Sequence, residues 1–366
     1  MQLSVSQAKP EHYTEAGECI LTPCQSWSSS DELLDVLWLR RQRSVVGVSL
    51  LILHNYATLA SEVGFAEALD SFTTLPSQTR RRLVESTPLR AWLWLMGELR
   101  LLEDGNPPDA ERLRRYLKEF RRLVQASAAT AQEGAAKSSY EIQRYDVDPL
   151  VQEVAPPSFV FDKLEERRAS AVNKAYSLKF FDTVVEAALR EIACVWPEMA
   201  RILPLFVTTI IHIPELEYRS CSAQRYAGAV ILSGSDDSLL ALEESLVHEC
   251  GHQILYCIME LTPLVIGNAE RTFRLPWSGS ERDLYGYFHA TFIYTLLALY
   301  MERARTRALI NREFADKRFR EIVAGLESAL SDFHEPGLLT PTGHEVLAAI
   351  SSVADILLKT RHLSFQ

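Results

Sequence analysis

Apolar side chains recur every three or four residues along most of this chain, which is the spacing of amphipathic helices. The pattern predicts helices over about 30–59, 64–71, 77–85, 88–104, 109–127, 163–193, 239–261, 289–305, 308–331 and 343–359. Two short runs of β-branched and apolar residues, 206–211 and 229–233, predict strands. We therefore expect a mainly α, multi-helix fold with a small β element packed beside the helix over 239–261.

The helical pattern weakens in the middle of the chain. Residues 127–140 are small and polar, and 141–161 are interrupted by prolines and are expected to be irregular. This predicts an N-terminal helical region over 1–126, a linker or mobile segment over 127–161, and a catalytic region over 162–366.

The helix over 239–261 carries the most informative residues. Ser238 is a suitable N-terminal cap, and Thr262-Pro263 ends the helix. Within it, the motif His248-Glu249-Cys250-Gly251-His252 matches H-E-x-x-H. Positions i and i+4 share one helix face, so two imidazoles at this spacing can bind one metal ion. Glu249 projects in a neighbouring direction, toward a metal-bound water or a substrate. The small Gly251 allows another segment to approach this helix closely.

A third protein ligand must complete such a centre. The metzincin extension is excluded, because Leu255 and Ile258 stand where Gly and His are required. The remaining carboxylate and imidazole candidates are His289, Glu260, Glu270 and Glu281, with His334 and His344 as fallbacks.

The segment before His289 favours it as the ligand. Residues 276–289 follow the pattern P-W-x4-R-x3-G-x2-H, downstream of L-V-H-E-x-x-H. Together these motifs resemble the family of HExxH-motif-containing peptide modification proteins, and the similarity is strongest over about 205–300. Members accompany ribosomally made, post-translationally modified peptides, and some are similar to iron(II)- and 2-oxoglutarate-dependent peptide β-hydroxylases.

The resemblance implies His248, His252 and His289 as metal ligands and Arg282 as the anchor for 2-oxoglutarate. The chemistry of arginine supports that role, because its planar fork of donors matches a carboxylate. Arg282 precedes His289 by seven residues, about two helical turns, so we expect one element to present both. The alternative for Arg282 is a surface ion pair with Glu281 or Asp283.

Composition and charge limit the classes of partner that we expect for the chain. The net charge is −10, from 38 basic and 48 acidic residues, which argues against nonspecific nucleic-acid binding. The six cysteines show no C-x-x-C pair, the N-terminus lacks a secretory pattern, and no apolar run is long enough to cross a bilayer. We expect a cytoplasmic protein that contacts neither nucleic acid nor membrane; the oligomeric state is left open.

Three functions remain. The first is an Fe(II)- and 2-oxoglutarate-dependent oxygenase that hydroxylates the β-carbon of a residue in a ribosomally synthesised precursor peptide. In that reaction Glu249 has no obligatory role and orients a ligand or the substrate. The second is a zinc metallopeptidase, in which Glu249 is the catalytic general base. The third is a helical scaffold or peptide carrier that has lost its metal.

Overall fold

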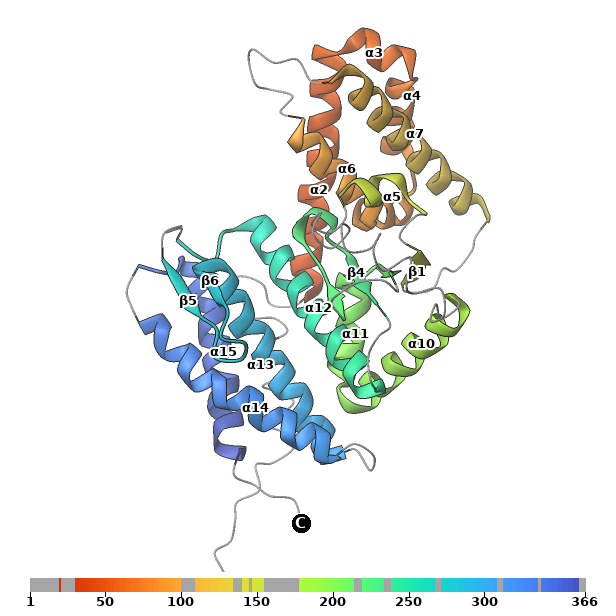
Figure 1. The fold of residues 1–366 in the computed structure, drawn as a ribbon. Coiled ribbons are helices and arrows are strands. Elements are labelled where there is room, and N and C mark those ends of the chain that lie inside the picture. Colours follow the sequence, from red (N-terminus) through yellow and green to blue (C-terminus); the bar gives the residue numbers. More distant parts are fainter. Residues whose placement is uncertain are drawn as a thin grey trace, which may run out of the picture. The chain divides into compact units, whose positions relative to one another are not determined.

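The computed structural model describes residue 20 and residues 30–99, 109–133, 140–144, 147–154, 178–213, 219–233, 238–266, 271–307, 312–334 and 337–361. Helices dominate these residues, and the strands form one small sheet and one two-stranded ribbon, so the predicted mainly α fold class is confirmed (Figure 1). No helix in the described part of the chain combines the length and the apolarity that crossing a bilayer requires.

The chain folds into two compact units. Unit 1 contains Met1–Leu33, Thr183–Leu205 and Asp236–Gln366, and unit 2 contains Leu34–Asp182 and Phe206–Ser235. These units are defined by packing in space, and each combines segments that are far apart in the sequence. The predicted regions 1–126, 127–161 and 162–366 are consecutive segments of the chain, and that division into regions stays a prediction.

Unit 2 packs helices over a small sheet. Its helical elements are α2 (Ser30–Asn55), α3 (Ala57–Glu62), α4 (Phe65–Thr74), α5 (Ser77–Glu85), α6 (Thr87–Glu98), α7 (Ala110–Glu133), α8 (Pro149–Glu153) and the short 3-10 turn η1 (Gln224–Tyr226). The strands are β1 (Glu141–Arg144), β2 (Thr209–His212), β3 (Ser220–Cys221) and β4 (Ala229–Leu232), in the order β1-β2-β4-β3. β1 and β4 run parallel to β2, and β3 is antiparallel to β4. Every residue of β2 and β4 is buried, as central strands require.

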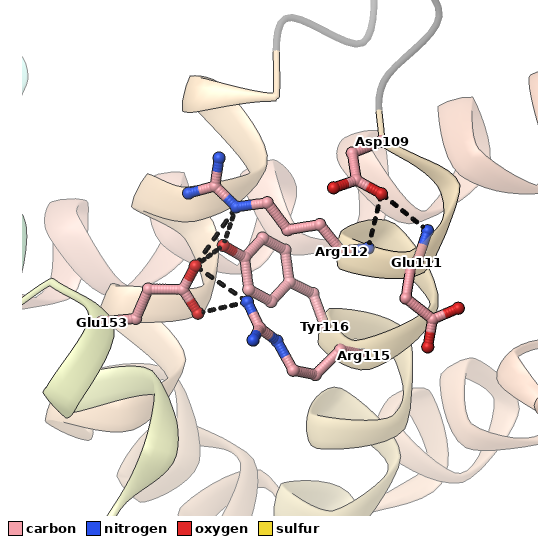
Figure 2. A network of polar contacts seen from close by, with 6 residues as sticks. All are labelled: Asp109, Glu111, Arg112, Arg115, Tyr116 and Glu153. Carbon is pink, nitrogen blue, oxygen red and sulfur yellow. Dashed lines mark hydrogen bonds and ion pairs between the residues drawn. The ribbon is translucent and has the colours of Figure 1, made fainter.

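A polar network joins α7 to α8 in unit 2 (Figure 2). The Glu153 carboxylate accepts hydrogen bonds from Arg112 at 3.2 Å, from Arg115 at 2.7 Å and from the hydroxyl of Tyr116. We call Arg112, Arg115, Tyr116 and Glu153 the Glu153 network. Each donor meets the same carboxylate, so the network fixes α8 against α7.

Unit 1 contains α10 (Leu178–Val195, which begins in unit 2), α11 (Pro197–Phe206, whose last residue lies in unit 2), α12 (Leu239–Leu261), α13 (Leu284–Arg307), α14 (Arg312–Ser331), the 3-10 turn η2 (Asp332–His334) and α15 (Pro341–Thr360). The antiparallel strands β5 (Thr272–Arg274) and β6 (Glu281–Asp283) form the ribbon. α13 is the central element, because α12, α14, α15 and both ribbon strands pack against it (Figure 1).

Some predicted elements differ in their boundaries. The helix predicted over 30–59 is two helices, because the backbone of Tyr56 leaves the helical conformation between α2 and α3. The helix predicted over 109–127 runs on to Glu133. The predictions for 100–104 and 163–177 lie outside the described residues.

The structure corrects the prediction that 141–161 is irregular, since β1 and α8 lie there. The sequence of β1, Glu-Ile-Gln-Arg, has only one apolar residue, and its strand conformation comes from parallel pairing with the buried β2. Asp148 caps α8 by accepting the backbone N–H groups of Leu150 and Val151.

Candidate metal centre

α12 has the boundaries that the sequence predicts. The hydroxyl of Ser238 accepts the backbone N–H of Ala241 at 3.2 Å, and the helix ends at Leu261, before Thr262 turns to an extended conformation. Most of its residues between Leu240 and Ile258 are buried, including Glu249. The helix is therefore held from several sides, and its two motif histidines occupy fixed backbone positions.

Gly251 sets the distance between α12 and α13. A Cβ atom at this position would lie 2.6 Å from Cδ1 of Ile293 and 2.7 Å from Cδ1 of Leu296, both on α13. Such distances are shorter than carbon atoms tolerate, so only glycine lets the helices approach this closely. The close approach that a small residue between the histidines predicts is confirmed.

His248 and His252 form a pair suited to one metal ion. Their Nε2 atoms lie 3.2 Å apart, and both rings are half-buried. Two nitrogens bound to one tetrahedral ion at about 2.0–2.1 Å lie about 3.3–3.4 Å from each other. The pair therefore matches the separation of two ligands of one ion.

His289 lies beside this pair, but it presents its nitrogens differently. It is buried in the second turn of α13, and its Nδ1 lies 3.3 Å from Nδ1 of His252. Its Nε2 instead lies 3.1 Å from the sulfur of Met259. The three imidazoles therefore adjoin one another, but their nitrogens do not converge on one point. No group of three His, Cys, Asp or Glu side chains in the described ranges has the arrangement of a complete metal site.

His248 and His252 thus have the nitrogen separation of two ligands of one ion, whereas the nitrogens of His289 do not face the same point. His248 and His252 are spaced to hold an ion as they stand. His289 has to rotate its ring away from Met259 before one of its nitrogens can face the same ion. The chain's own residues supply a partly formed centre.

Burial keeps these imidazoles neutral. Burial of the His252 ring, with a smaller effect from His248, lowers its pKa to about 4. Burial, and then the neighbouring His252, lower the pKa of His289 well below its usual value. Neutral imidazole is the form that binds metal, so neither ring has to lose a proton at neutral pH.

Aromatic rings enclose the histidines. Tyr285 stacks on His289 with ring centroids 4.3 Å apart, and Tyr256 stacks on His252 at 5.9 Å. Tyr294 approaches His248 edge-on at 6.4 Å. The stacked rings restrict how His252 and His289 turn. Sequence reasoning missed these tyrosines; Tyr285, four residues before His289 on α13, could have been found from helical spacing.

The Pro276-Trp277 segment supports this wall of aromatic rings. Trp277 stacks on Tyr294 with centroids 4.1 Å apart, and its indole N–H donates to the carbonyl of Ile322 at 2.8 Å. Gly325 on α14 leaves the space for this indole, because a Cβ there would lie 2.3 Å from the indole nitrogen. Trp277 thereby joins the segment before β6 to α13 and α14 next to His248.

Arg282 lies on the ribbon and His289 on α13, so the expectation that one element presents both residues is wrong. It sits in the middle of β6, and α13 begins two residues later, at Leu284. Its side chain is exposed, and the predicted surface ion pair is absent, because no described residue forms an ion pair with it. Asp283 instead accepts the backbone N–H of Gly286 at 2.8 Å and caps α13.

The stem of Arg282 lies against the first turn of α13. A Cβ on Gly286 would lie 3.3 Å from Cδ and 3.4 Å from Cβ of Arg282. Gly286 precedes His289 by three residues and shares its side of the helix. The R-x3-G-x2-H spacing thus brings the guanidinium stem to the part of α13 that carries His289.

The ribbon separates its side chains by face. In the register of the ribbon, Arg282 stands directly opposite Phe273, and Glu281 stands directly opposite Arg274. Directly paired residues share a face and successive residues alternate, so Arg274 lies on the face opposite Arg282. Arg271 joins the Phe273 face, because its guanidinium lies 4.7 Å from that ring.

The other predicted ligands do not join the cluster. Glu281 stands opposite Arg274 in the strand register, on the ribbon face away from Arg282. His344 is exposed on α15. Glu260 lies on α12 but about a quarter-turn away from the face shared by the motif histidines. Glu270 and the side chain of His334 lie outside the described residues. In unit 2, His212 is buried and stacks on Phe181 with ring centroids 4.0 Å apart.

Two further acidic residues of α12 are bound to α13 and α14. Tyr300 donates a hydrogen bond to Glu243, and Arg318 pairs with Glu244 at 2.7 Å. Burial, with a contribution from Glu191, raises the pKa of Glu243, while the bond from Tyr300 opposes the shift. These contacts hold α12 in place against α13 and α14.

No protein-family model matches the chain, and no curated protein matches it significantly.

Proposed function

We propose that this chain is a non-haem iron oxygenase that uses 2-oxoglutarate to hydroxylate the β-carbon of a residue in a ribosomally synthesised precursor peptide. The main support is the position of Arg282, whose stem lies against Gly286 one turn before His289. A guanidinium with no ion-pair partner among the described residues, on a stem that lies against the helix of His289, suits a ligand that has both a metal-chelating end and a free carboxylate.

In this proposal each residue has a separate task. His248 and His252 hold the iron, and His289 completes the set after its ring rotates. Arg282 binds the far carboxylate of 2-oxoglutarate. Bound iron would hold 2-oxoglutarate, whose oxidative decarboxylation to succinate and carbon dioxide would take up one oxygen atom of dioxygen and leave the other for insertion into a C–H bond of the peptide. Glu249 orients a ligand or the substrate and moves no proton.

The charge of the ligand set also favours an anionic cosubstrate. Three neutral imidazoles leave both positive charges of a divalent ion uncompensated. An anionic keto acid compensates them, and the site then leaves positions for it and for dioxygen. We further propose a cytoplasmic location, a precursor peptide as the partner, and contact with neither nucleic acid nor membrane.

An anaerobic titration tests the proposal. 2-Oxoglutarate is added to the Fe(II)-loaded protein while a visible metal-to-ligand charge-transfer band is followed. We expect a saturable band, which Arg282→Gln weakens by shifting the midpoint to higher concentration. Arg274→Gln is the matched control, because Arg274 belongs to the same ribbon but to its opposite face. The absence of a band in the unmodified protein would refute the proposed cosubstrate, and an equal shift in both variants would refute the role of Arg282.

A zinc peptidase is the alternative, and the burial of Glu249 directly after His248 favours it. In that reaction Glu249 is general base to a zinc-bound water. Glu249→Gln decides between the two. A peptidase loses nearly all turnover of a peptide substrate, whereas the oxygenase retains its charge-transfer band and part of its hydroxylation.

A further inference from the structure

Met259 lies on the same face of α12 as the motif histidines. It follows His252 by seven residues and His248 by eleven, which are close to two and three helical turns. Its sulfur lies 3.1 Å from Nε2 of His289. A thioether is not a usual partner for a buried imidazole, because its sulfur is only a weak acceptor.

This contact determines which nitrogens carry protons when no metal is bound. A neutral imidazole has one donor and one acceptor, and a thioether can only accept. Nε2 of His289 therefore donates to Met259, and its Nδ1 accepts from Nδ1 of His252. Nε2 of His252 then accepts from Nε2 of His248. These contacts connect His248, His252, His289 and Met259 in one series of hydrogen bonds.

In this state His289 is unavailable to a metal ion, because its Nε2 carries the proton and its Nδ1 is engaged with His252. Nε2 of His248 also carries a proton, which has to move to Nδ1 of the same ring before His248 can bind the ion through Nε2. We infer that Met259 is a positioning residue that holds His289 in a resting orientation, and that metal binding exchanges the His289–Met259 contact for a metal–nitrogen bond. The inference rests on the metal centre proposed above, and it concerns the step by which the third ligand joins.

A thioether suits this task. It satisfies a buried N–H without adding a charge, and its weakness as an acceptor keeps the cost of release small. A carboxylate in the same place would favour a charged imidazolium and hold it firmly. A flexible methionine side chain can also move aside when the imidazole turns.

The test measures zinc affinity of the full-length, metal-free protein by competition with a chelator. Met259→Leu removes the acceptor and keeps a similar volume, so we expect zinc to bind about three- to tenfold more tightly. Met259→Gln supplies a stronger acceptor and is expected to weaken zinc binding. Met301→Leu on α13 is the matched control and leaves affinity unchanged.

A double-mutant cycle shows whether Met259 acts through His289. In the His289→Ala background, the effect of Met259→Leu is expected to disappear. An effect that persists there would overturn the inference in favour of general packing. Weaker zinc binding in Met259→Leu would also overturn the inference, because it would identify the Met259 sulfur as a metal ligand. A thioether is a donor that copper prefers.

The metal-free protein gives a second measurement. ¹⁵N spectra of labelled histidines are expected to show the proton of His289 on Nε2 and that of His252 on Nδ1. A proton on Nδ1 of His289 would overturn the inference. If the protein bound no zinc at all, both the proposed metal centre and the exchange of the His289–Met259 contact for a metal–nitrogen bond would be refuted. The spectra would then test only whether Nε2 of His289 donates to Met259 in the metal-free protein.

Discussion

The histidine cluster of unit 1 and the Glu153 network of unit 2 satisfy their polar atoms in opposite ways. In the Glu153 network, two guanidiniums and a phenol converge on one carboxylate, and the shortest guanidinium contact is 2.7 Å (Figure 2). In the histidine cluster, comprising His248, His252, His289 and Met259, neutral rings bind one another and a thioether at 3.1–3.3 Å. The first arrangement is built on a charged acceptor, whereas the acceptors of the second are neutral and one of them, the thioether, is weak.

The difference indicates which cluster serves structure and which serves chemistry. Charge-assisted bonds are about twice as strong as neutral ones, so breaking the Glu153 network costs folding energy. Neutral imidazoles with weak partners contribute little to folding and are ready to exchange a hydrogen bond for a metal bond. Substitutions in the two clusters should therefore affect different measurements.

The largest effect is expected from His252→Ala. His252 contacts both other imidazoles, so its loss removes one ligand of the preformed pair and the neighbour of His289. We expect zinc affinity to fall at least about 100-fold, or about 2.7 kcal/mol, while the metal-free protein loses about 1 kcal/mol of stability or less. Chelator competition and urea unfolding measure the two quantities. The control variant is His54→Ala, because His54 is exposed. If His54→Ala lowered zinc affinity as much as His252→Ala, the assignment of His252 as a metal ligand would be wrong.

Glu153→Gln is expected to show the reverse behaviour. The neutral amide cannot accept charge-assisted bonds from Arg112 and Arg115, and it places N–H groups near their guanidiniums. The free energy of unfolding should fall by about 2 kcal/mol, with zinc affinity unchanged. Glu111→Gln is the control, because the carboxylate of Glu111 pairs with Arg114 while its side chain is 83% exposed, and solvent screens such a pair so that it contributes little to stability. Similar unfolding curves for the two variants would show that the network contributes no more than a surface ion pair.

The sequence predicted the histidine cluster better than it predicted the Glu153 network. Helical spacing places His248 and His252 on one face of α12 with no knowledge of the rest of the fold. The network depends on a contact between α8 and α7, and nothing local in Pro149–Glu153 signals that contact. The same limit explains Met259, whose partner His289 is thirty residues away on another helix.

The position of Arg282 shows a second limit of sequence reasoning. Counting helical turns from His289 assumed that one helix continues back through Arg282. The turn at Gly279 and the antiparallel pairing of Arg282 with Phe273 end that continuity. The spacing nevertheless reflects a real contact, because Gly286 accommodates the arginine stem. The motif spacing corresponds to the contact between Arg282 and Gly286, whereas the ribbon that carries Arg282 was visible only in the structure.

The smallest effect is expected from Gly251→Ala, which tests whether close helix packing supports the histidine cluster. The new methyl group would overlap the side chains of Ile293 and Leu296, at a cost of about 1–3 kcal/mol, and alanine would return about 1 kcal/mol of helix propensity. We expect a net loss of about 1 kcal/mol in unfolding free energy and weaker zinc binding, because α13 shifts and carries His289 with it.

Ile293→Val removes the Cδ1 atom that meets the new methyl group, so the double variant should recover part of both losses. Gly47→Ala on α2 is the matched control, because a Cβ there has no neighbour within 4 Å, and it should stabilise the protein by up to about 1 kcal/mol. If Gly251→Ala lowered stability but left zinc affinity intact, the spacing of α12 and α13 would matter for folding alone.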